Sequence, residues 1–151
     1  MHIHTWVQIY NIGTKVNKVQ ILITGAAGFI GFHLVNELIN LGYSVIGIDN
    51  LNDYYNPTLK LNRLEIIHDN KNATKFEFIK EDIHNKRGIE KIFEQYEFDI
   101  VINLAAQAGV RYSLEKPHKY IDSNLVGFMN ILEGCRHKKI RHLIYASSSS
   151  V

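Results

Sequence analysis

The stretch TGAAGFIG, Thr24 to Gly31, carries three glycines in the spacing G-x-x-G-x-x-G. It follows a short apolar run, Val19 to Thr24, and precedes apolar residues at helical spacing between Ile30 and Leu41. Glycines at a strand-to-helix turn permit a tight bend, close approach of a pyrophosphate to backbone N–H groups and close packing of the helix. The stretch therefore predicts a strand, a dinucleotide-binding turn and a helix.

The rest of the chain repeats this alternation of short apolar runs and amphipathic segments. Further strands are expected at 44–49, 76–79, 100–104 and 143–147, and helices from Pro57, over roughly 89–96 and near 118–137. Short, continuously apolar strands suit a parallel sheet that right-handed crossover helices cover on both faces. We expect an α/β, doubly wound parallel sheet with five strands over residues 18–151, and we leave residues 1–17 unassigned.

Composition and charge limit the kinds of binding partner and the cellular location that we expect for the protein. A net charge of +2, from 17 basic and 15 acidic residues, favours neither nucleic acid nor a membrane surface as a partner. The single cysteine, Cys135, lies among apolar residues at helical spacing and is interpreted as a core residue. His2 and His4 are too few for a metal site, so no metal is expected. No stretch resembles a membrane span or signal peptide, and the cytoplasm is the expected location.

Asp49 is the candidate that selects the dinucleotide. It ends the second expected strand, 18 residues after Gly31, near the distance at which an acidic residue meets the adenosine ribose. A carboxylate there accepts hydrogen bonds from both ribose hydroxyls and repels a 2′-phosphate, and no arginine lies in the following NLNDYYN, residues 50–56. The sequence therefore favours NAD over NADP as the cofactor.

Five motifs together resemble a known family. They are G-x-x-G-x-x-G, IDNLNDYYN from Ile48, NLAAQAGVRYS from Asn103, DSNLVGFMNILE from Asp122 and YASSSSV from Tyr145. The chain resembles the extended short-chain dehydrogenases/reductases that act on nucleotide sugars, the NAD-dependent epimerase/dehydratase family. Within them it is most similar to the UDP-glucuronate 4-epimerases, including the CapI type of capsule biosynthesis. The resemblance implies a Rossmann domain, truncated before the remaining strands and the substrate domain, and a homodimer as the full-length enzyme.

The resemblance also implies a cofactor site distributed over the strand ends. Asp82 and Ile83 would flank the adenine, the small residues after the fourth strand would let the backbone approach the cofactor, and Asn124 would support the loop at the nicotinamide side. Two structural alternatives stay open, a turn cap for Asp82 and a buried helix amide for Asn124. The expected cofactor residues are Gly25, Ala27, Gly28, Phe29, Ile30, Gly31, Asp49, Asn50, Asp53, Asp82, Ile83, Leu104, Ala105, Ala106, Gln107 and Asn124.

The serines near Val151 and one arginine are the expected catalytic and substrate residues. The family position that delivers a hydroxyl to the sugar 4-hydroxyl corresponds to Ser148. Ser149 and Ser150 stand where related dehydratases and decarboxylases carry acids, so two neutral hydroxyls could hold a uronate carboxylate. Arg111 is the cation expected to meet an anionic substrate or a pyrophosphate. A flexible linker is the alternative interpretation of the serines.

These features predict the NAD-binding part of a UDP-glucuronate 4-epimerase, which would interconvert two UDP-uronates through a 4-keto sugar. Its base would be a tyrosine whose pKa a lysine lowers, in a Tyr-x-x-x-Lys motif. We expect no such motif in these 151 residues, and therefore expect the catalytic base to be absent from them. An epimerase acting on a neutral UDP-hexose and a non-catalytic dinucleotide-binding module remain as alternatives.

Overall fold

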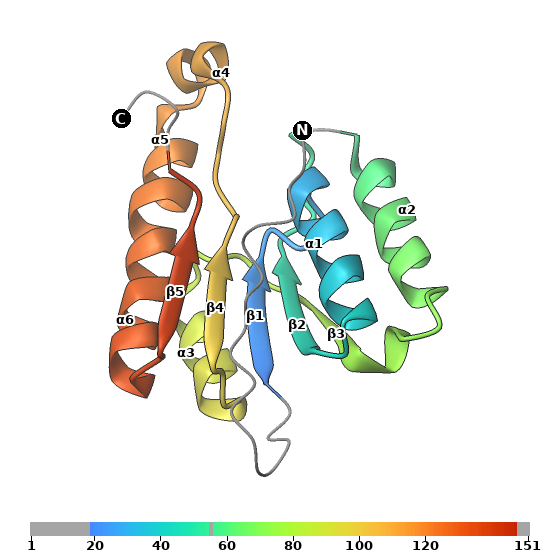
Figure 1. Ribbon diagram of the computed structural model, residues 1–151. Helices are drawn as coiled ribbons and strands as arrows, with labels where there is room; N and C mark the ends of the chain where they lie inside the picture. Colours follow the sequence, from blue (N-terminus) through green and yellow to red (C-terminus); the bar gives the residue numbers. More distant parts are fainter. Residues whose placement is uncertain (1–18, 55, 148–151) are drawn as a thin grey trace.

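Five parallel strands form a single twisted sheet in the computed structural model, which describes residues 19–54 and 56–147. The strand order is β3-β2-β1-β4-β5, so the first strand of the chain lies in the middle (Figure 1). The strands are β1 Gln20–Thr24, β2 Ser44–Asp49, β3 Phe76–Lys80, β4 Ile100–Asn103 and β5 His142–Tyr145. The predicted five-stranded, doubly wound Rossmann fold is confirmed.

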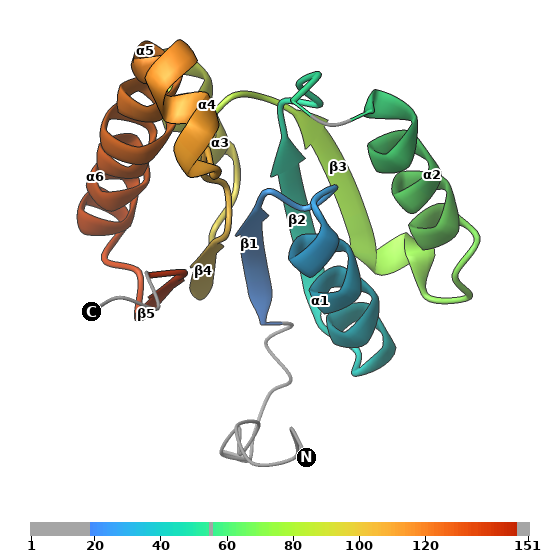
Figure 2. The same cartoon turned by 90° about the horizontal axis from the view of Figure 1, so that it is seen from above.

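Helices cover both faces of the sheet. Figures 1 and 2 show α1 and α2 on one face and α3 and α6 on the other. The helices are α1 Phe29–Asn40, α2 Pro57–His68, η1 Ala73–Lys75, α3 Lys86–Gln95, α4 Val110–Glu115, α5 Pro117–Tyr120, η2 Ile121–Gly127 and α6 Phe128–Lys138. The N-terminus of α2 follows from its sequence, because Asn56 caps the N–H of Thr58 and Pro57 occupies the first turn.

The two-residue period of the strands divides the core into two layers. In β1, Ile21 and Ile23 pack with α1 and α2, whereas Leu22 packs with α3 and α6. All three are at most 2% exposed, so β1 is buried on both faces. This burial explains why the strand is a continuous apolar run.

The crevice of the fold lies where the strand order reverses. β1 pairs with β2 on one side and with β4 on the other: the chain runs from β1 through β2 to β3 at one edge, and then crosses over to β4 on the other side of β1. Ligands of open α/β sheets bind beyond the carboxyl ends of the strands at such a point. The glycine turn Thr24–Gly31 leaves β1 at this edge.

Two elements differ from the sequence prediction. Residues 110–115, expected as a loop, form the short helix α4. The long helix expected near 118–137 is divided into α5, the π-helical segment η2 and α6. Ser148, Ser149 and Ser150 lie outside the described residues.

Candidate dinucleotide-binding site

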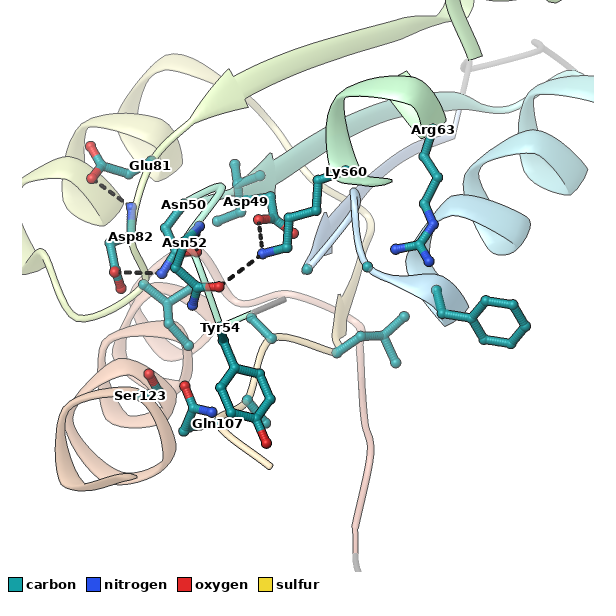
Figure 3. Close-up of a pocket in the computed structure, with 18 of the residues that line it drawn as sticks. Asp49, Asn50, Asn52, Tyr54, Lys60, Arg63, Glu81, Asp82, Gln107 and Ser123 are labelled. Atoms are coloured by element: carbon teal, nitrogen blue, oxygen red, sulfur yellow. Dashed lines mark hydrogen bonds and ion pairs between the residues drawn. The ribbon is translucent and has the colours of Figure 1, made fainter. Parts of the chain in front are cut away.

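A cavity of about 380 Å³ opens at the carboxyl ends of β1 to β4 (Figure 3). It is lined by Gly25, Gly28, Phe29, Ile48, Asp49, Asn50, Asn52, Tyr54, Leu59, Lys60, Arg63, Glu81, Asp82, Ile83, Leu104, Ala105, Ala106, Gln107 and Ser123. Eleven of these residues belong to the predicted cofactor set. The sequence-derived residues from four separate segments therefore meet around one cavity.

The glycine turn has the conformation that an approaching phosphate needs. Gly25 has a φ of +70°, which favours glycine, and its carbonyl accepts the N–H of Gly28 at 2.9 Å. A Cβ on Gly31 would lie 2.1 Å from the Gly25 oxygen, so only glycine lets α1 dock this closely. No side chain caps the N-terminus of α1, and its first-turn N–H groups remain available to an anion. The turn fits the pyrophosphate of a dinucleotide.

Asp49 lies at the end of β2 and is nearly buried, with 6% of the residue exposed. Its Oδ1 accepts the N–H of Leu51 at 2.8 Å and an ion pair from Lys60, also at 2.8 Å. Lys60 reaches Asn52 as well, at 3.3 Å (Figure 3). The counter-charge that the sequence analysis did not find in residues 50–56 is thus supplied from α2.

A polar cluster follows β3 at the opposite side of the cavity. Asp82 accepts hydrogen bonds from the side chain of Asn50 at 2.7 Å and from the backbone of His84 at 3.1 Å, and it pairs with the His84 ring at 2.8 Å. Burial raises the pKa of the Asp82 carboxyl, but the hydrogen bonds from Asn50 and His84 outweigh it and lower the pKa below its usual value. Asp82 is therefore a carboxylate at neutral pH, able to accept a further hydrogen bond.

The loop after β4 is held from two sides. Thr24 at the end of β1 donates to Asn103 at 2.7 Å and accepts the N–H groups of Leu104 and Ala105. Asn124 of η2 accepts the N–H of Gln107 at 2.8 Å and donates to its carbonyl at 2.9 Å. Asn124 thus holds the loop at Gln107, and its amide bonds the loop instead of its own helix. Its expected place at the nicotinamide side stays a prediction.

Several predicted residues do not line the cavity. Ala27 and Gly31 are buried behind the glycine turn, Ile30 is exposed on α1, and Asp53 lines a smaller adjoining pocket. Arg111 is exposed on α4, outside the lining of both pockets. Its role, like those of the serines outside the described residues, stays a prediction.

The chain contains one Tyr-x-x-x-Lys spacing, Tyr112 to Lys116, so the prediction that no such motif occurs in it was wrong. Tyr112 lies on α4 and its ring packs 4.8 Å from that of Tyr54. Both rings line the smaller pocket together with Asp82, on the side of the cavity expected to hold adenine. This position does not suit a base for the sugar, so the pair is not assigned as catalytic.

Lys60 and Arg63 are site residues that the sequence analysis missed. Arg63 donates to the carbonyl of Ala27 at 3.1 Å and lies 5.9 Å from the centre of the Phe29 ring. A signal was present, because two cations three positions apart share one face of a helix. The direction of that face could not be known before α2 was placed beside β2.

Residues 22–151 match the family model described as GDP-mannose 4,6 dehydratase. The chain belongs to this family. Among curated proteins that the chain resembles is protein CapI of Staphylococcus aureus, which is 55% identical over 132 residues. That match covers 87% of this chain and 38% of the relative.

The chain also resembles solved structures of nucleotide-sugar epimerases. The UDP-glucuronic acid 4-epimerase of Bacillus cereus, a mutant in complex with UDP-4-deoxy-4-fluoro-glucuronic acid and NAD, is 38% identical, with a TM-score of 0.77. The match covers 88% of this chain and 41% of that one. The UDP-glucose 4-epimerase of Thermotoga maritima, with UDP-glucose, is 33% identical, with a TM-score of 0.73, and the match covers 86% and 38% of the two chains. The predicted resemblance to nucleotide-sugar epimerases is confirmed, and the chain spans about two fifths of the length of these relatives.

Two further findings concern the described residues. No helix in 19–54 or 56–147 is both long and apolar enough to span a bilayer. Over the same residues, no group of three or more His, Cys, Asp or Glu side chains is arranged to hold a metal ion.

Proposed function

We propose that residues 18–151 are the NAD-binding domain of a nucleotide-sugar 4-epimerase that interconverts UDP-glucuronate and UDP-galacturonate. The observation that carries the proposal is the cavity at the reversal of strand order, where the uncapped α1 terminus and Asp49 face the same space (Figure 3). The relatives named above, one of them solved with a uronate analogue and NAD, support it.

The chain's own residues would hold NAD along the cavity. The N–H groups at the start of α1 would bind the pyrophosphate. Asp49 would accept hydrogen bonds from the ribose hydroxyls, and Asp82 would accept a hydrogen bond from the adenine. The loop that Thr24 and Asn124 hold would lie along the path to the nicotinamide. The chemistry that NAD supplies when bound is the reversible acceptance of a hydride, here from C4 of the sugar.

The proposed reaction needs a base and a positioned hydroxyl. Ser148 would hold the sugar 4-hydroxyl while a general base takes its proton, and the resulting 4-keto sugar would be reduced again on its other face. The base is proposed to lie beyond Val151, in the part of the relatives' length that this chain does not span. A homodimer, the state that the family resemblance implies, is proposed for the whole protein.

The uronate is proposed as the substrate because of Ser149 and Ser150. Neutral hydroxyls can donate to a carboxylate, whereas acids at these positions would repel it. A neutral hexose is the second candidate, and the likeness to the UDP-glucose 4-epimerase of T. maritima favours it.

The test uses the extended protein, meaning this chain continued past Val151 to the length of its relatives. Incubation with NAD and UDP-glucuronate should yield UDP-galacturonate with little carbon dioxide, measured by separating the UDP-sugars. Ser149→Ala and Ser150→Ala should each raise KM for the uronate. The increase should correspond to at most about 1.5–3 kcal/mol of binding free energy, the value of one hydrogen bond to a charge.

A parallel incubation with UDP-glucose serves as the control for substrate class. Faster epimerisation of UDP-glucose than of the uronate would favour the second candidate. Release of carbon dioxide as the main reaction, or an unchanged KM in both serine variants, would contradict the proposed role of the serines.

A further inference from the structure

The two cations that line the cavity both come from α2. Lys60 and Arg63 lie one helical turn apart, and Figure 3 shows Lys60 directed to Asp49 and Arg63 directed toward the start of α1. The remaining charged lining residues are Asp49, Glu81 and Asp82. Positive charge therefore gathers where the ribose and the phosphates of a dinucleotide would lie.

The ion pair between Lys60 and Asp49 is nearly buried. The side chains are 11% and 5% exposed, and their atoms Nζ and Oδ1 lie 2.8 Å apart. Removing one member of a buried pair leaves the other charge without compensation. Each side chain thus determines how strongly the other attracts a ligand.

The second carboxylate oxygen of Asp49 faces the cavity. Both hydrogen bonds of Asp49 go to Oδ1, from Lys60 and from the N–H of Leu51. Within residues 19–54 and 56–147, no fully buried side-chain oxygen lacks a partner, so the unbonded Oδ2 is in contact with the cavity. Lys60 therefore holds Asp49 with Oδ2 turned toward a ligand.

We propose that Lys60 forms a latent site for a ribose 2′-phosphate, reinforced by the neighbouring charge of Arg63, and that the carboxylate of Asp49 keeps this site closed. This inference rests on the proposed NAD-binding function. With Asp49 present, its carboxylate balances the positive charge of Lys60. The free Oδ2 then repels a phosphate but accepts hydrogen bonds from the ribose hydroxyls of NAD. Without that carboxylate, the buried ammonium of Lys60 needs a counter-charge, and the 2′-phosphate of NADP supplies it.

Arg63 adds the second charge from a fixed position. Its hydrogen bond to the Ala27 carbonyl and its place over the Phe29 ring hold the guanidinium beside the glycine turn. From there it reinforces the positive field for any dinucleotide, because NAD and NADP share the pyrophosphate. Lys60, paired with Asp49, is the residue that distinguishes the two.

The experiment measures binding of NAD and NADP to the extended protein by titration calorimetry. Relative to the original protein, Asp49→Ala should lower the affinity for NAD and raise the affinity for NADP. Each change should be about tenfold or more, which is the value of a hydrogen bond to a charge. Asp49→Asn keeps an acceptor for the Leu51 N–H and should shift the two affinities in the same directions. Adding Lys60→Met to Asp49→Ala should abolish the gain in NADP affinity.

Lys86→Met is the matched control, because that lysine is 76% exposed on α3 and lines no part of the cavity. Combined with Asp49→Ala, it should leave the gain for NADP in place. No gain for NADP in either Asp49 variant, or a gain that survives Lys60→Met, would overturn the latent site. An original protein that binds neither dinucleotide would instead contradict the proposed function.

Discussion

Thr24 shows how one hydroxyl can join two halves of a site. It is fully buried at the last position of β1, and its Oγ1 makes three hydrogen bonds, to Asn103, Leu104 and Ala105. These bonds tie the end of β1 to the loop after β4, across the point where the strand order reverses. The apolar run in the sequence placed Thr24 in a strand but could not reveal this polar role.

Thr24→Val should therefore destabilise the extended protein and weaken its NAD binding. Valine has the same shape but leaves buried polar partners unsatisfied, at a cost of about 1–3 kcal/mol in the free energy of unfolding. Urea unfolding measures this change. Thr58→Val, at an exposed position of α2, is the control and should stay within about 0.5 kcal/mol. Equal stabilities for the two variants would show that the Thr24 hydroxyl does not hold the loop.

Asp82 should make the stability of the protein depend on acid pH. The pKa of the Asp82 carboxyl in the folded state lies below its usual value of 3.8, so the ionised carboxylate stabilises the fold above that pH. This contribution is lost as the pH falls through the folded pKa. The stability difference between the original protein and Asp82→Asn should thus shrink below pH 3.8, as measured by urea unfolding between pH 6 and pH 3.

Asn50→Ala provides the comparison for that prediction. It removes the 2.7 Å hydrogen bond that favours the charged form of Asp82, so the pKa of Asp82 should rise toward its usual value. NMR titration of the Asp82 carboxyl carbon in both proteins measures this directly. An unchanged pKa would assign the lowering to His84 alone.

The residues of the site differ in how far the sequence could predict them. Asp49 was predictable because it ends an apolar run at a known distance from the glycines, and both features are local. Lys60 and Arg63 were not, because their role depends on the direction in which α2 crosses β2. Ser123 lines the cavity for a similar reason, since a π-helical segment changes which side chains of η2 face inward.

Among the elements, α1 depends most on one glycine. Intrinsic helix propensity predicts that Gly31→Ala stabilises a helix by about 0.5–1 kcal/mol. The structure predicts the opposite sign, because the new Cβ would lie 2.1 Å from the Gly25 oxygen and the helix would have to shift. We expect a loss of about 1–3 kcal/mol, as for other overpacked cores, and a weaker affinity for NAD.

Thermal unfolding and NAD titration of the extended protein test this prediction. Glu37→Ala, on the exposed face of the same helix, is the control and should change neither quantity appreciably. A Gly31→Ala protein as stable as the original would mean that α1 docks less tightly than described.

The helices and strands differ in how well the hydrophobic pattern of the sequence predicts them. The inner strands β1, β2 and β4 were predictable because burial on both faces requires continuous apolar runs, whereas the edge strands β3 and β5 are more exposed and were predicted from shorter apolar runs. The helix α4 has six residues and none of them is buried, so no apolar period marks it. The π-helical segment η2 lies within a helical sequence pattern and does not change its composition, so neither α4 nor η2 could be predicted. The role of Asn124, which holds Gln107, became visible only in the structure.

For the molecule as a whole, apolar surface gathers around β5. Its residues Ile144 and Tyr145 are 54% and 55% exposed. β5 is also the edge of the described sheet, with one side unpaired. Exposed apolar edges promote association between molecules.

A polypeptide limited to residues 1–151 should therefore aggregate, bind NAD weakly at most and show no epimerase activity. It holds the proposed hydroxyl of Ser148, but no residue assigned here serves as the base. Size-exclusion chromatography measures association, and long incubation with NAD and each UDP-uronate measures activity, with the extended protein as the positive control. Epimer formation above the rate without protein would contradict this expectation.

The central place of β1 has a consequence for the order in which the molecule assembles during synthesis. Ile21 pairs with Val45 of β2, which leaves the ribosome soon after it, and with Ile100 of β4, which emerges much later. Contacts between residues near in sequence form first, because they close shorter loops. The nascent chain can thus form the half of the cavity that contains the glycine turn and Asp49. Until β4 is synthesised, one edge of β1 remains unpaired. In that interval a chaperone, or a dinucleotide already held by the first half, would protect the strand on which both halves depend.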